Sequence, residues 1–357
     1  MKGILVLCLS CILFSTFAQE NSEQKRTLEF SGFLDFYYGF DFNRPAESKR
    51  FPFLYNHTRH DQFALNLGLL SATYRSIGFR ANLALQRGTY VADNYSLEPK
   101  ALRWIHQANI GLALNPKQNL WLDVGIMPSH IGFESAVSTE NLTLSRSLVA
   151  ENSPYFETGA KLGWSASEKW DLALFYLIGW QRIKGIEGKN KPSFGTQAIF
   201  RPSEKASINW STFLGTNDGI ELNRMLYFSN FYGNFKLGSR WKLISGFDLG
   251  WRTQEASPTA QWWGFSAIAS YSWSENLSSA FRWEHYADQE GVIAQAFFGT
   301  GLQTSGYSIN VDRKMGKWGM IRLESRWLIS PKESFLRSGD SVSDNFFLLG
   351  SFAVQID

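Results

Sequence analysis

The chain of 357 residues has only two cysteines, Cys8 and Cys11, and both lie near its start. If this first segment is removed on export, the remaining protein contains no thiol. That absence excludes disulfides, thiolate metal sites and cysteine nucleophiles from the mature protein.

Long apolar runs and charge clusters are also scarce. Past residue 20 no run approaches the roughly 18 apolar residues that a membrane-spanning helix requires, so we exclude a helical membrane protein. Only 19% of residues are charged, and the net charge of +3 comes from Lys and Arg scattered singly. No basic block is present that would follow phosphates, so we expect no nucleic-acid partner.

Familiar catalytic motifs are missing as well. The sequence has no Gly-rich phosphate loop before a helix, no GxSxG, no HExxH and no EF-hand loop. We therefore predict a protein that is not an enzyme, with no catalytic residue, no metal and no cofactor.

The first residues have the features of a secretory signal peptide. A lysine at position 2 precedes a short apolar run from Ile4 to Phe17, and Thr16 and Ala18 are small residues at the positions that a signal peptidase recognises. We predict a signal peptide over residues 1–18 and a single domain over residues 19–357.

Aromatic residues are abundant, at 16%, and most of them follow a two-residue period. Leu28, Phe30, Leu34 and Phe36 alternate with polar positions such as Asp35, which is typical of a strand with one apolar face. Residues 62–69 show the same pattern, with Phe63, Leu65, Leu67 and Leu69 on the apolar side. About sixteen such segments occur, centred near residues 35, 66, 81, 109, 124, 160, 175, 197, 211, 231, 246, 267, 281, 307, 323 and 351.

The connections between these segments are alternately short and long. The long polar ones cover residues 43–60, 87–104, 128–155, 181–193, 215–224, 252–260, 287–302 and 330–344. A barrel of about sixteen strands is too wide for side chains to fill, so its apolar face must meet lipid. The sequence predicts an all-β transmembrane antiparallel β-barrel of about sixteen strands, with short periplasmic turns and long extracellular loops.

Three pairs of tryptophans, each ten residues apart, fall on the apolar side of their segments. At about 3.3 Å per residue and a tilt near 40°, ten residues project to roughly 25 Å, the height of the lipid-facing band of such barrels. We predict an aromatic girdle made of Trp170, Trp180, Trp241, Trp251, Trp263 and Trp273. Around Phe175 and Phe347 both faces of the strand are apolar, which an inserted loop or a subunit interface would each explain.

Several strings of the mature chain resemble the OmpL-like β-barrel porin family of Bacteroidota. The strings are 41–45 (DFNRP), 53–60 (FLYNHTRH), 88–95 (GTYVADNY), 121–135 (WLDVGIMPSHIGFES) and 148–155 (LVAENSPY). The resemblance implies an outer-membrane location and passive diffusion of small hydrophilic solutes or ions. We expect membrane lipid as a partner, and the sequence leaves open whether the chain forms a homo-oligomer. The resemblance carries over no catalytic residue. A barrel receptor or adhesin, and a barrel hydrolase, are the alternatives.

The resemblance also implies that the third long loop folds into the barrel, as it commonly does in porins. The loop at 128–155 is the longest connection and contains Glu134, Glu140 and Glu151. Positions expected to face the lumen include Arg80, Lys242, Arg282, Arg322 and Arg326. We hypothesise that these acidic and basic groups oppose one another across a constriction and set a transverse field.

Each of the five histidines is a candidate metal ligand, a candidate catalytic group or an ordinary structural residue. His57 and His60 are three residues apart beside Asp61, a spacing that could hold a metal, although ordinary loop hydrogen bonding fits better. His130 lies near Ser129 and Glu134, but sequence neighbours rarely form a catalytic triad. His106 and His285 fall on the lipid side near strand ends and are expected at the membrane interface.

Overall fold

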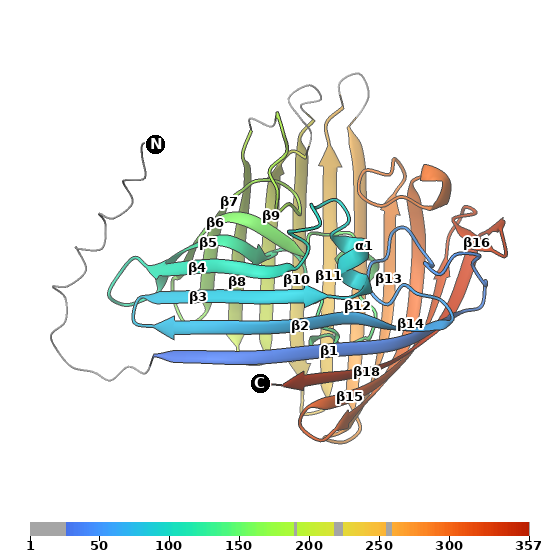
Figure 1. Ribbon diagram of the computed structural model, residues 1–357, viewed down its shortest axis with the longest axis horizontal. Helices are drawn as coiled ribbons and strands as arrows, with labels where there is room; N and C mark the ends of the chain where they lie inside the picture. The colour runs from blue at the N-terminus through green and yellow to red at the C-terminus, as the bar shows by residue number, and fades with distance from the viewer. Residues whose placement is uncertain (1–25, 189–190, 218–223, 255–258, 357) are drawn as a thin grey trace, which may run out of the picture.

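The computed structural model describes residues 26–188, 191–217, 224–254 and 259–356, so the predicted signal peptide lies outside the described residues. Sixteen antiparallel strands form a closed barrel, in which β1 pairs with β2 on one side and with β18 on the other. The strands at the front of Figure 1, β1 to β5, cross those at the back steeply, as tilted strands of a barrel do. The barrel strands are β1 (Thr27–Asp41), β2 (Gln62–Ser76), β3 (Phe79–Arg87), β4 (Ile105–Ala113), β5 (Leu120–Pro128), β6 (Phe156–Ser165), β7 (Trp170–Leu177), β8 (Ser193–Ser203), β9 (Ala206–Gly215), β10 (Leu226–Leu237), β11 (Trp241–Arg252), β12 (Ala260–Ser272), β13 (Leu277–Asp288), β14 (Leu302–Met315), β15 (Gly319–Ile329) and β18 (Asp344–Ile356).

The remaining elements belong to the long loops. Two short helices, α1 (Thr89–Asn94) and α2 (Leu148–Glu151), two 3₁₀ turns, η1 (Ser138–Glu140) and η2 (Phe297–Gly299), and the hairpin β16 (Phe335–Arg337) and β17 (Asp340–Val342) all lie there. No helix in the described part of the chain is long and apolar enough to cross a membrane.

The alternation predicted from the sequence is present in the strands, and all sixteen predicted centres fall within barrel strands. In β1 the outward Phe36 is 49% exposed, whereas the neighbouring inward Asp35 is fully buried. The all-β barrel and its alternation of short and long connections are therefore confirmed.

Two β-bulges correct the predicted facing of side chains. In β2 the register shifts where Asp35 pairs with Leu67 but Phe36 pairs with Leu65, so Leu67 turns inward and is buried while Leu70 points out. A similar shift occurs between β3 and β4, where Ala84 pairs with Gln107 but Leu85 pairs with Ile105, so His106 has no partner in β3. A bulge reverses which side of the sheet the following residues face. Leu67, Leu69 and His106 were therefore assigned to the wrong face.

Long loops fill part of the barrel with apolar side chains. Phe51, Phe53 and Leu54 from the first loop and Leu144, Leu148 and Val149 from the third pack in one buried cluster with strand residues that include Phe175 and Phe347. Contact with inserted loops therefore explains why the strands at Phe175 and Phe347 are apolar on both faces. The short helix α1 contacts β2 and β3, and its Tyr90 is buried in a second cluster with Phe156.

The structure places five of the six predicted girdle tryptophans on the outer face and the sixth inside the barrel. Trp170, Trp241, Trp251, Trp263 and Trp273 are between 36% and 61% exposed on the outer face. Trp180 lies beyond the end of β7, is 8% exposed and packs at 5.0 Å between ring centroids against both Phe213 and Phe228 inside the barrel. The ten-residue spacing misassigned Trp180 because the strand ends before it.

The start of β1 and the end of β18 lie at the short-turn end of the barrel, since Gly32 pairs with Ile356 and the Gln355 amide donates to the Trp318 carbonyl. We predict that epitope tags inserted near Asn217 or Gly339 will bind antibody on intact cells, whereas tags near Gln118 or Lys169 will not. A tag planned near Ser257 lies outside the described residues. Antibody binding only to the tags near Gln118 and Lys169 would show that the barrel has the opposite orientation, with its short turns outside the cell.

Candidate functional site: the third loop and the cavity beside it

The third loop, residues 129–155, runs inside the barrel and is anchored to lumen-facing side chains. At its start, His130 Nδ1 lies 2.8 Å from Glu157 Oε2, and His130 Nε2 lies 2.9 Å from the Thr212 carbonyl oxygen. The next anchor is the Gly132 amide, which donates to Asn230 Oδ1 at 3.1 Å. These contacts carry the loop from β5 across to strands β9 and β10.

The far part of the loop is held by a buried network of arginines and carboxylates. Arg282 donates to the Ser145 carbonyl at 2.6 Å and pairs with Glu324 at 2.9 Å. Arg326 pairs with Glu284 at 2.6 Å, and the other oxygen of Glu284 accepts from the Leu148 amide, also at 2.6 Å. All of these side chains are fully or almost fully buried, so each charge is compensated within the network.

A third arginine fixes the tip of the loop. Arg322 pairs with Asp312 at 2.8 Å and donates to the Asn141 carbonyl at 3.0 Å and to the Ser138 carbonyl. Residues 138–148 are therefore bound to the wall formed by β13, β14 and β15. A loop anchored in this way narrows the lumen.

The predicted opposition of glutamates and arginines across a constriction is not what the structure shows. Arg282, Arg322 and Arg326 pair with carboxylates of their own wall and with backbone carbonyls, while Arg80 pairs with Asp123 at 2.7 Å. Lys242 is exposed at the start of β11, away from the loop. The wall arginines hold the loop in place instead of facing an open passage.

The three predicted loop glutamates have three different environments. Glu151 is buried and accepts from the Tyr55 amide at 2.8 Å and from the Tyr155 hydroxyl at 2.9 Å, so it joins the first and third loops. Glu134 accepts from the Ser147 amide at 2.9 Å, and burial raises the pKa of its carboxyl, an effect that nearby Arg282 opposes. Glu140 is exposed, and its carboxylate makes no hydrogen bond or ion pair within the described chain.

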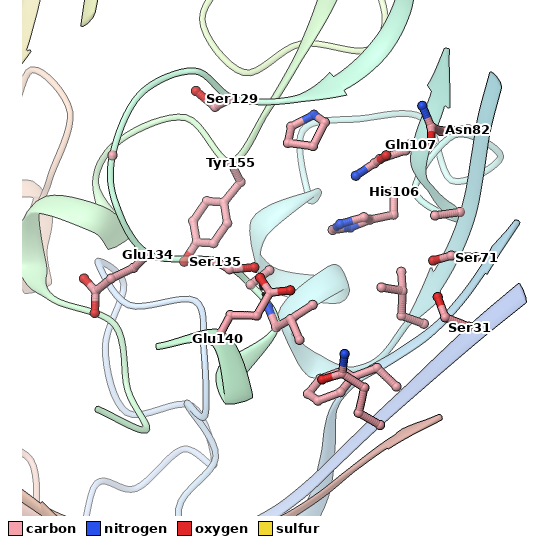
Figure 2. Close-up of a pocket in the computed structure, with 18 of the residues that line it drawn as sticks. Ser31, Ser71, Asn82, His106, Gln107, Ser129, Glu134, Ser135, Glu140 and Tyr155 are labelled. Carbon is pink, nitrogen blue, oxygen red and sulfur yellow. Dashed lines mark hydrogen bonds between the residues drawn. The ribbon is translucent and has the colours of Figure 1, made fainter. Parts of the chain in front are cut away.

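Glu134 and Glu140 line a cavity of about 520 Å³ between the third loop and the wall formed by β1 to β4. Figure 2 shows Glu140 projecting from the loop toward that wall, from which Ser31, Ser71, Asn82 and Gln107 point back. The wall side carries hydroxyl and amide groups without formal charge. The cavity is therefore polar, with its acidic groups on the loop.

A second cavity of about 400 Å³ adjoins the first and shares Asn82, Gln107 and Ser129 with it. Lys161 lines this second cavity and makes no hydrogen bond or ion pair among the described residues. Glu140 and Lys161 are thus charged groups beside the loop that have neither a hydrogen bond nor an ion pair among the described residues. The alternation of β6 indicates that Lys161 faces the lumen, but no local pattern shows that it lacks a partner.

The histidine alternatives can be judged from their contacts. His57 Nε2 lies 2.8 Å from Asp35, and His60 Nδ1 accepts from the Asp41 amide at 3.0 Å. No cluster of potential metal ligands occurs in the residues that the structure describes. Ser129 donates to Glu157 at 3.3 Å, while both ring nitrogens of His130 face acceptors.

Comparison with known proteins gives a consistent result. Residues 27–356 match the family described as "Putative beta-barrel porin-2, OmpL-like". No curated protein matches the sequence.

Several solved structures share the fold. An anion-selective porin from Comamonas acidovorans has a TM-score of 0.61 at 8% identity, over 93% of this chain and all of that one. OmpF of Salmonella typhi, in complex with daunomycin, has a TM-score of 0.63 at 10% identity, over 95% of this chain and all of that one. OmpT of Vibrio cholerae, in a trimer form, has a TM-score of 0.58 at 10% identity, over 92% and 99% of the two chains. These structures share the fold, and the family match over residues 27–356 shows that the chain belongs to the OmpL-like beta-barrel porin-2 family and is an outer-membrane porin.

Proposed function

We propose that this porin is a non-catalytic channel in which small hydrophilic solutes diffuse between the third loop and the wall formed by β1 to β4. The observation that carries the proposal is the position of the loop. Its bonds to Asn230, Glu324 and Arg322 hold it against strands β10 to β15 and leave the polar cavity on the opposite side.

The contacts of Ser129 and His130 support a channel without catalysis. A serine nucleophile requires a base that can accept its proton. His130 has both ring nitrogens directed at oxygen acceptors, and the Ser129 hydroxyl is directed at Glu157. This pair therefore acts as an anchor for the start of the loop.

We further propose that Glu140 and Lys161, in place of the predicted wall arginines, set the electric field that solutes meet. Each lines one of the two adjoining cavities without a hydrogen bond or ion pair among the described residues, and they come from the loop and from β6 respectively. Arg146, which also lines the first cavity, is buried, donates to the Ala150 carbonyl and stacks on the Tyr155 ring. An unpaired charge in a narrow aqueous passage acts on passing ions more strongly than a compensated pair.

Planar-bilayer recording tests the proposed channel. The purified, heat-modifiable barrel should produce discrete conductance steps, and it should release neither fatty acid from phospholipid nor fragments from peptide substrates. Hydrolysis that is lost in Ser129→Ala would establish the hydrolase alternative, and the absence of any conductance would favour the receptor or adhesin alternative.

We also propose that identical copies of the chain associate in the membrane. One similar structure, OmpT of Vibrio cholerae, is a trimer form. Crosslinking in intact outer membranes should yield species at multiples of the monomer mass. A single monomer band at every crosslinker concentration would contradict this proposal.

A further inference from the structure

A groove of about 710 Å³ lies on the outer surface of β11 to β14, near the short turns. It is lined mainly by apolar and aromatic side chains: Trp241, Ala269, Tyr271, Trp273, Phe281 and Ile309. The ring centroids of Trp241 and Tyr271 are 4.9 Å apart, and those of Tyr271 and Trp273 are 4.8 Å apart. The aromatic rings therefore form a continuous rim, and the groove opens into the lipid-facing band.

Polar contacts fix this rim. Arg240 Nη1 donates to the Tyr271 hydroxyl at 3.0 Å, and the Trp273 indole N–H donates to Ser279 Oγ at 2.9 Å. The first contact places the exposed guanidinium of Arg240 at the edge of the groove. Its other N–H groups have no hydrogen-bond partner among the described residues.

A second arginine lies on the other side of the groove. Trp241 pairs with Tyr271, Tyr271 with Ser279 and Ser279 with Val311, so these residues form one row across four strands. Arg313 is two residues beyond Val311 on the same outward face, and Arg240 immediately precedes Trp241. With about 4.8 Å between strands, the two backbones are roughly 14 Å apart. Two arginine side chains can approach each other across that distance.

We propose that this groove binds one glycerophospholipid of the membrane leaflet at the short-turn end, with an acyl chain in the groove and the phosphate between Arg240 and Arg313. Guanidinium groups hydrogen-bond phosphate oxygens in a planar, paired geometry. Tryptophan and tyrosine favour the depth of the lipid headgroups. Asp312, next to Arg313 in sequence, faces the barrel interior and pairs with Arg322. Glu275 is exposed in the turn after β12, so one carboxylate stands against two arginines and the rim keeps a net positive charge.

Charge complementarity distinguishes this occupant from a protein partner. The apolar part of the groove would accept any hydrocarbon, but two arginines at the membrane interface specify an anionic headgroup next to it. The proposal does not depend on conduction through the lumen, because every residue involved faces outward.

Native mass spectrometry of the detergent-purified full-length protein, titrated with phosphatidylglycerol, tests the site. The unaltered protein should bind one molecule more tightly than any other. Replacing both arginines, Arg240→Gln with Arg313→Gln, should weaken that binding about tenfold, the scale expected for losing hydrogen bonds to a charged group. The matched control, Lys117→Gln with Lys169→Gln, removes two exposed charges from other short turns and should leave the binding unchanged.

Two further measurements separate the acyl chain from the headgroup. Ala269→Trp fills the groove and should weaken lipid binding while the arginines remain. Millimolar inorganic phosphate should not displace the lipid, because the acyl chain provides much of the affinity. The proposal would be overturned if the arginine variant bound the lipid as tightly as the unaltered protein does. It would also be overturned if the lysine control lost as much lipid affinity as the arginine variant, or if free phosphate displaced the lipid. Retained heat-modifiability shows that each variant is folded.

Discussion

Deletion of residues 136–145 should raise the single-channel conductance several-fold. These residues include η1 and the carbonyl groups of Ser138 and Asn141 that Arg322 holds against the far wall. Removing them takes away the part of the third loop that crosses the lumen. Conductance rises with the open cross-section of a water-filled pore, so the deletion should act directly on it.

The barrel itself should tolerate this deletion. All sixteen strand pairings lie outside the deleted segment, and Arg322 keeps its pair with Asp312 while Arg282 keeps its pairs with Glu284 and Glu324. The purified variant should therefore remain heat-modifiable, and planar-bilayer recording should show larger steps with the same number of channels per added protein.

A deletion in another long loop serves as the control. Residues 185–188 are mostly exposed, and removing them shortens a loop without touching the third loop. We expect unchanged conductance in that variant. If removing 136–145 has no greater effect than removing 185–188, the third loop does not form the constriction.

The strands could be predicted from the sequence because their signal is local. A two-residue period is visible within each segment, and the alternation of short and long connections fixes the antiparallel order. The bulge at Asn66 was missed because it inserts one residue without a distinctive composition. Every residue after it in β2 then faces the opposite way, which is why Leu67 and Leu69 were misassigned.

The constriction could be predicted only in outline. That the long loop at 128–155 enters the barrel followed from its length and the family resemblance, but its partners are far away in sequence. Ser145 binds Glu324, and Arg322 binds the carbonyl of Asn141, each across roughly 180 positions of the chain. No period or motif links such residues. The sequence therefore identified Arg282, Arg322 and Arg326 as lumen residues but could not show that they are fully paired.

Neutralising Glu140 should shift ion preference toward anions. A unit charge acts on an ion about 4 Å away with roughly 1 kcal/mol in water, and with more where the surrounding protein lowers the dielectric constant. Glu140 is exposed to the cavity and unpaired, whereas the wall opposite carries uncharged Ser31 and Asn82. Glu140→Gln should therefore lower the cation-to-anion permeability ratio roughly fivefold at low salt.

Reversal potentials under a salt gradient measure this ratio, and three comparisons identify its cause. Lys161→Gln should move the ratio in the opposite direction, because it removes the unpaired cation of the adjoining cavity. Glu187→Gln, at an exposed carboxylate of another loop, should have no effect. The shift should also shrink in 1 M salt, where charges are screened within about 3 Å. If Glu140→Gln and Glu187→Gln give the same ratio at low salt, the field in the passage does not come from Glu140.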